Sequence, residues 1–132
     1  MEKDNDFIYY GAFISEKDRE TFLKKCNKLI PEGWTVYFDH CTLLHHSDVK
    51  HREHAWVYER LLGKEHTMLV TSIGKSDKAL ALGVAAASFN DMPHITIATA
   101  PHAKPVESNN ITAWSIIPPE LRFTITGKID KK

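Results

Sequence analysis

HITIAT, residues 94–99, is rich in β-branched side chains and directly follows Pro93. This composition predicts a β-strand, and alternation along a strand places His94 and Thr96 on one face, with the isoleucines behind them. HCTL, residues 40–43, repeats the pattern of a histidine, any residue, a threonine and an aliphatic residue. We therefore expect two strands that each present an imidazole and a hydroxyl on one face and pack apolar side chains behind it.

The rest of the chain shows helix and strand patterns around these two stretches. An amphipathic helix is expected over Glu16–Leu29, with Ser15 as its N-cap, and a shorter helix over Ala55–Leu62, which Gly63 ends. Strands are expected over residues 7–14, 34–45, 68–73, 79–87, 94–99 and 121–129. Turns and loops are expected over residues 46–54, 74–78 and 100–110. Short strands with few helices define an α+β fold class with mostly antiparallel pairing.

Length and composition fit one globular domain that covers residues 1–132. A content of 42% hydrophobic and 26% charged residues is unlike that of a disordered chain and supports a core without disulfides. Lysine and arginine (17) balance aspartate and glutamate (17), which excludes a binder that holds nucleic acid or a membrane by bulk positive charge. Cys26 and Cys41 are too few for a disulfide scaffold, so we expect two buried free thiols.

Targeting signals and common enzyme motifs give little support to other classes. The N-terminal sequence MEKDNDFIYY carries charge where a signal peptide is apolar, and no apolar run approaches the ~20 residues of a membrane span. We expect an intracellular monomer, in the cytoplasm or nucleus, without a membrane partner. A P-loop, a zincin motif and the nucleophile elbow of α/β-hydrolases are absent from the sequence, which disfavours those enzymes.

A histidine-rich stretch, HHSDVKHREH at residues 45–54, raises the alternative of a metal site. Zinc needs three or four ligands on a rigid frame at defined spacing. This stretch is polar and interrupted by lysine and arginine, which is typical of a solvated surface loop. We expect such a loop, with no bound metal and no cofactor, and a metal-dependent protein stays as the alternative.

Two His-x-Thr strands that face each other would surround a phosphate with His40, Thr42, His94 and Thr96. One neutral imidazole takes a proton from the attacking water, and the other, protonated, donates one to the leaving oxygen. The threonine hydroxyls donate to the non-bridging oxygens, which carry negative charge in the transition state. Two unrelated strands that each contain a histidine are the alternative. Cys41 alternates to the opposite face from His40, so we expect a packing thiol rather than a nucleophile.

The stretch PHITIATAPHAKPVESN, residues 93–109, joins the second motif to a loop with Lys104-Pro105 and Ser108-Asn109. The paired motifs resemble the signature of the 2H phosphoesterase superfamily, and this stretch resembles the cyclic phosphodiesterase domain of fungal and plant tRNA ligases. The resemblance implies a two-lobed α+β fold with pseudo-twofold symmetry around a central groove. It also implies metal-independent hydrolysis of a 2′,3′-cyclic phosphate on an RNA end or nucleotide, to a 2′-phosphate. Carried over by position, the catalytic residues are His40, Thr42, His94 and Thr96.

Three further residues are candidate substrate contacts: Lys104, Tyr10 and Trp114. Lys104 lies beside the second motif and could hold a flanking phosphate, whereas Tyr10, Trp114 and also Tyr9 could stack on a base. A solvated loop lysine and aromatic core packing are the alternatives.

Other activities of the same fold stay open. The quartet is equally compatible with cleavage of 2′,5′-linked or cyclic oligonucleotides, as in other members of the superfamily. A nucleotide-binding module without turnover is a further alternative. The adenylating lysine motif and the kinase P-loop of tRNA ligases are absent from this sequence, so we expect neither ligase nor kinase activity.

Overall fold

The computed structural model describes residues 7–132, which form an antiparallel sheet with few helices and confirm the α+β class. The strand of the second His-x-Thr motif has the expected bounds, and the expected hairpin before it is present. In this part of the chain the strands are β1 (Tyr9–Ile14), β2 (Thr35–Val36), β3 (His40–His45), β4 (Glu65–Lys75), β5 (Ala79–Ala85), β6 (His94–Thr99), β7 (Trp114–Ile116) and β8 (Phe123–Lys131).

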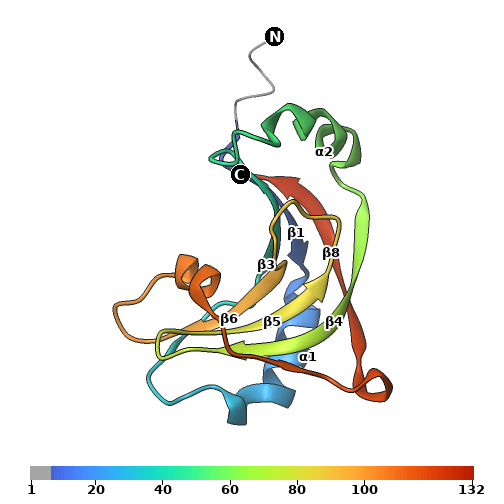
Figure 1. Ribbon diagram of the computed structural model, residues 1–132. Coiled ribbons are helices and arrows are strands. Elements are labelled where there is room, and N and C mark those ends of the chain that lie inside the picture. Colours follow the sequence, from blue (N-terminus) through green and yellow to red (C-terminus); the bar gives the residue numbers. More distant parts are fainter. Residues whose placement is uncertain (1–6) are drawn as a thin grey trace.

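The sheet closes on itself because β6 pairs with β3 on one edge and with β5 on the other. Around the ring the order is β3, β1, β8, β4, β5 and β6 (Figure 1). The ring divides into two halves of three strands, β3–β1–β8 and β6–β5–β4, each with a His-x-Thr strand at its edge. This matched order is consistent with the two-lobed, pseudo-twofold arrangement that the resemblance implies. It places both motifs at the seam between the halves.

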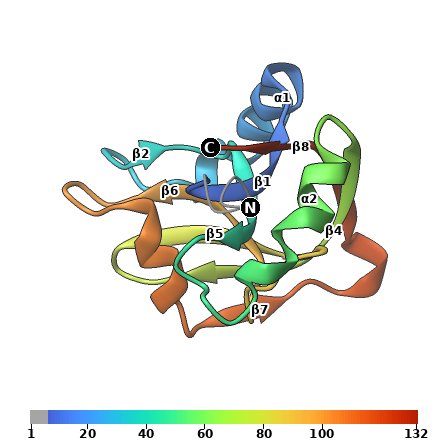
Figure 2. The same cartoon turned by 90° about the horizontal axis from the view of Figure 1, so that it is seen from above.

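Two α-helices, α1 (Glu16–Cys26) and α2 (Ala55–Leu61), lie on different sides of β8 in the view from above (Figure 2). The Ser15 side chain caps α1 by accepting a hydrogen bond from the amide of Asp18 at 3.2 Å, and Gly63, with a φ of 83°, follows α2. No helix within residues 7–132 is long and apolar enough to cross a membrane. The short 3₁₀ turns are η2 (Asn27–Leu29), η3 (Arg52–His54), η4 (Pro105–Asn110) and η5 (Pro119–Leu121).

Several strand bounds differ from those expected. The strand expected over residues 34–45 is interrupted at Phe38, whose φ is 49° and whose ring is buried. The amide of Phe38 donates to the carbonyl of Thr96 at 2.9 Å, so the interrupted segment still follows the edge of β6. β4 extends beyond the expected 68–73 because its first part pairs with β8 and its last part with β5 and β7. β7 escapes sequence analysis because this long-range pairing defines it.

One face of the motif strands fills the inside of the closed sheet. Cys41 and Leu43 on β3, and Ile95 and Ile97 on β6, are fully buried. A slip of one residue would expose these side chains and bury the histidines, so the apolar face fixes which way the motifs point. Cys26 and Cys41 are both buried and free, as expected.

Candidate active site

The structure brings the four motif residues to one cavity. β3 and β6 pair antiparallel at Cys41 and Ile95, so the strands that carry the two motifs run side by side (Figure 1). The cavity they line has a volume of about 840 Å³. The motif residues on its wall are His40, Thr42, His94 and Thr96. The expected convergence of two imidazoles and two hydroxyls is therefore possible in this fold.

The His40 ring is held by a carboxylate on one side and by aromatic rings around it. Its Nδ1 lies 2.9 Å from Oδ1 of Asp39. The rings of Tyr9 and Phe13 stack on it at centroid distances of 4.9 and 5.1 Å. Between these two residues on β1, a Cβ on Gly11 would lie 3.3 Å from His40 Cδ2, so the ring rests over a glycine. With Nδ1 occupied, Nε2 is the nitrogen left to act on a substrate.

The His94 ring is held by a backbone carbonyl. Its Nδ1 lies 2.8 Å from the carbonyl oxygen of Met92, which can accept but not donate. The neutral ring therefore carries its proton on Nδ1 and has a lone pair on Nε2. Burial lowers the pKa of His94 below its usual value, the hydrogen bond to Met92 opposes this, and the nearby charge of His40 adds to the lowering. The neutral form of His94 is therefore favoured, and its Nε2 can accept a proton.

The Thr96 hydroxyl is oriented by a buried residue that sequence analysis interpreted as part of a turn. Its Oγ1 lies 2.8 Å from Oγ of Ser108, which is 1% exposed and belongs to η4. If Ser108 donates this hydrogen bond, the proton of Thr96 is free for a phosphate oxygen. Within the expected loop of residues 100–110, the 3₁₀ turn η4 is thus the element that supplies Ser108.

The histidine-rich loop also reaches the cavity. His45 and His51 line it together with Asp48 and Lys50. Asp48 holds His51 through an Oδ2–Nδ1 contact of 2.9 Å, and the His51 ring stacks on Phe89 at 4.5 Å. Within residues 7–132 no three His, Cys, Asp or Glu side chains gather in a way that could hold a metal ion. The expected surface loop is only partly exposed, because several of its side chains form a wall of the candidate site.

The three candidate substrate contacts do not line this cavity, and two of the interpretations need correction. Tyr10 is fully buried and its hydroxyl donates to Glu59, because its side chain points into the core. Trp114 lies against Gly74 and donates its ring N–H to a backbone carbonyl, as a packing residue does. Base stacking by Tyr10 or Trp114 would require them to leave these positions. Lys104 is exposed directly before η4, whose first residue lines the cavity. Of the stacking candidates, Tyr9 is the one on the cavity wall.

Cys41 faces away from the cavity, on the core side of β3, and is fully buried. Burial raises the pKa of Cys41 to about 12. A thiolate is therefore disfavoured there at neutral pH, and a Cys–His nucleophilic pair with His40 is excluded by placement.

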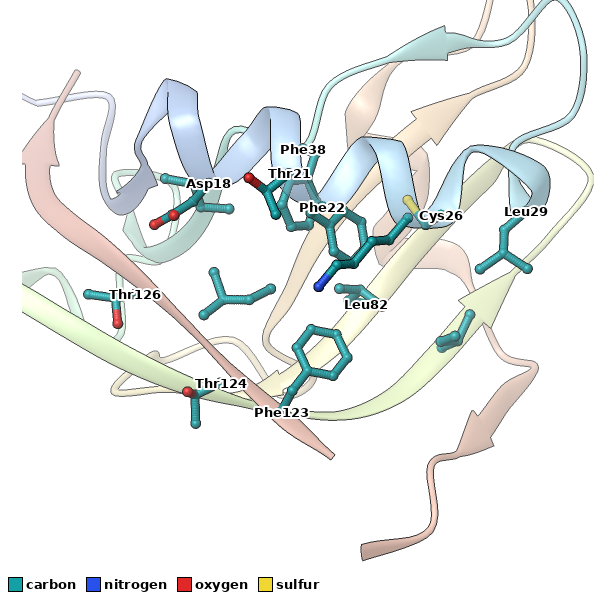
Figure 3. A pocket seen from close by; sticks show the side chains of 14 residues that line it. Asp18, Thr21, Phe22, Cys26, Leu29, Phe38, Leu82, Phe123, Thr124 and Thr126 are labelled. Atoms are coloured by element: carbon teal, nitrogen blue, oxygen red, sulfur yellow. The ribbon is translucent and has the colours of Figure 1, made fainter. Parts of the chain in front are cut away.

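A second cavity, of about 710 Å³, lies between α1 and strands β4, β5 and β8 (Figure 3). Its walls are mostly apolar and include Phe22, Phe38, Leu82 and Phe123, with Asp18 and threonine side chains at its edge. No histidine lines it. The paired motif histidines therefore line the cavity at the seam between the two motif strands and not this one.

Comparison with known proteins finds similarity among solved structures. No protein-family model matches this chain, and no curated protein matches its sequence. Among solved structures, the crystal structure of a fungal RNA kinase matches with a TM-score of 0.61 and 17% sequence identity. The match covers 94% of this chain but 45% of that chain, so this chain spans less than half the length of its neighbour. At this identity the match supports the fold, an α+β protein with a closed antiparallel sheet.

Proposed function

We propose that the protein is a metal-independent phosphodiesterase of the 2H type, which hydrolyses a 2′,3′-cyclic phosphate on an RNA end or nucleotide. The observation that carries this proposal is the cavity shared by His40, Thr42, His94 and Thr96. Each histidine is held at Nδ1, which leaves Nε2 for proton transfer. A structural neighbour that is an RNA kinase favours an RNA substrate over other phosphodiesters.

The proposed reaction adds one water across one P–O bond of the cyclic phosphate. Nε2 of one neutral histidine takes a proton from the water as its oxygen bonds to phosphorus. Nε2–H of the other histidine gives a proton to the ribose oxygen as the P–O bond breaks. The product is a ribose hydroxyl and a phosphate monoester, the 2′-phosphate by resemblance to the tRNA ligase domains. Thr42 and Thr96 donate to the non-bridging oxygens.

The test is an assay of purified protein, with chelator present, against a 2′,3′-cyclic nucleotide and an oligoribonucleotide with a cyclic phosphate end. We expect hydrolysis of at least one substrate, unchanged by chelator because imidazoles supply the proton transfers. Activity that disappears with chelator and returns with zinc or manganese would contradict the metal-independent mechanism. Cleavage of 2′,5′-linked or cyclic oligonucleotides in preference would assign the alternative substrate class, and binding without turnover would contradict an enzyme.

A further inference from the structure

The two histidines of the candidate site have chemically different partners at the same ring nitrogen. Nδ1 of His40 lies against the carboxylate of Asp39, whereas Nδ1 of His94 lies against the neutral carbonyl of Met92. A carboxylate stabilises the charged imidazolium, and a carbonyl does so less. The pseudo-twofold arrangement of the motifs therefore does not extend to the groups that hold their histidine rings.

Asp39 is fixed at the entrance to β3 by its own backbone and by its surroundings. Its carbonyl accepts a hydrogen bond from the amide of Ile14 on β1 at 2.9 Å. Nε of Arg19 on α1 donates to the carbonyl of Tyr37, and the Arg19 charge acts favourably on Asp39. The side chain of Asp39 is 55% exposed and that of His40 is 24% exposed, so the ion pair is open to solvent on one side.

We propose that Asp39 is a positioning residue that keeps His40 protonated and Nε2-directed, which makes His40 the general acid and His94 the general base. This inference rests on the proposed hydrolysis and assigns the two roles that the paired motifs leave open. In the reaction, His40 gives its Nε2 proton to the leaving ribose oxygen while Asp39 holds Nδ1–H. His94 takes the proton of the attacking water, so the pair starts each turnover as one cation and one neutral ring.

The charges around Asp39 and His40 agree with this assignment. The hydrogen bond to His40 is the largest cause that lowers the pKa of Asp39, which keeps this carboxylate charged beside the His40 ring. Burial and the Asp39 charge raise the pKa of Tyr9, which keeps this phenol neutral beside the ring. The ionisable groups in contact with Asp39 or His40, or acting on them, include Tyr9 on β1, Arg19 on α1 and His94 on β6. Lys132 lies over the Phe13 ring, and the same cavity is lined by His45, Asp48, Lys50 and Asp91.

The first experiment measures the histidine rings by NMR titration in the protein without substrate. Asp39→Asn keeps the shape and a hydrogen-bond acceptor but removes the charge. We expect the His40 ring to titrate about half a pH unit lower in this variant, a shift suited to a partly exposed pair. The matched control is Asp48→Asn, which removes the carboxylate of the other Asp–His pair and should move His51 but not His40. An unchanged His40 titration in Asp39→Asn would overturn the inference.

The second experiment measures the pH dependence of kcat in the same variant. We expect the alkaline limb to move to lower pH by a similar amount, because that limb reports loss of the proton from the acid. The acidic limb and KM should stay near their wild-type values. Asp77→Asn, an exposed carboxylate in the turn between β4 and β5, is the control for charge alone and should change neither limb.

The outcomes separate this inference from the function on which it rests. Wild-type protein that hydrolyses none of the cyclic phosphates would overturn the proposed function. Active wild-type protein with the same alkaline limb in Asp39→Asn would overturn the role of Asp39 alone. Loss of the acidic limb in Asp39→Asn would reverse the assignment, with His40 as the base.

Discussion

His40 and His94 carry both proton transfers of the proposed reaction, and each is half-buried on the wall of the cavity. Replacing either with alanine should lower kcat by roughly 10²–10⁴-fold, the usual contribution of one general acid or base. Thr42→Ala and Thr96→Ala should cost less, because each removes one neutral donor. Steady-state kinetics measure the effect, and circular dichroism of each variant confirms that it folds. Near-native turnover in a folded histidine variant would contradict the two-histidine mechanism.

The same two residues should determine the pH profile of the proposed hydrolysis. The base must be neutral and the acid protonated, so kcat should be bell-shaped with a maximum at about pH 6–7. Burial lowers the pKa of His94, which places the acidic limb on the low side of a free histidine. Residual activity of His94→Ala should lack the acidic limb, and that of His40→Ala should lack the alkaline limb. A rate that rises steadily to pH 9 would indicate hydroxide or a metal-bound water as the nucleophile.

Some residues of the candidate site could be placed from the sequence, and others could not. His94 and Thr96 could be placed on one face because alternation with buried isoleucines leaves no other register. Tyr9 and Tyr10 could not be distinguished, because both faces of β1 are aromatic or apolar. Alternation puts Tyr9 against His40 and sends Tyr10 into the core. The partner of His40 could not be predicted either, since the Asp39 contact depends on the interruption before β3.

At the scale of elements, β6 pairs with β5, and β5 in turn approaches β4 closely. Ser72 on β4 pairs with Gly83 on β5, and Gly83 pairs in turn with His94. A Cβ on Gly83 would lie 2.1 Å from Oγ of Ser72. That hydroxyl is buried and has no hydrogen-bond partner among the residues described. The absence of a side chain at position 83 thus allows β4 and β5 to pair closely next to the strand of the second motif.

Gly83→Ala should therefore lower the free energy of unfolding by about 1–3 kcal/mol, the usual cost of overpacking a core. Ser72→Ala removes an unpaired buried hydroxyl and should cost little. The double variant should be more stable than the sum of the single changes predicts, because the second change removes the atom that obstructs the first. Urea unfolding of the four proteins measures this coupling. Additive effects would contradict the contact between Ser72 and position 83.

Elements with strong local signals were predictable, and elements defined by distant partners were not. Ser15 and Gly63 are at the ends of helices where their local chemistry places them. β6 has its expected bounds because Pro93 precedes a β-branched run. β7 has no such signal, and the expected loop of residues 46–54 gave no sign that it would form a cavity wall.

At the scale of the whole molecule, the chain carries no excess of positive charge, and neither does the wall of the candidate site. The charged residues on the cavity wall are one lysine, Lys50, and three aspartates, Asp39, Asp48 and Asp91. Binding of an oligonucleotide there should release few counterions, so KM should rise by only about 3-fold between 50 and 200 mM salt. Lys50→Ala should weaken this dependence. A steep salt dependence that Lys104→Ala removes would show instead that the substrate backbone runs over the exposed loop before η4.

The closed ring has a consequence for folding while the chain is being synthesised. β8 pairs with β1 in one half and with β4 in the other, and so forms the seam opposite the motifs. All four motif residues precede it in the chain. During translation the ribosome thus releases both histidines before the strand that completes the ring. A nascent chain stalled before residue 123 contains every residue of the quartet and lacks the strand that closes the ring behind them.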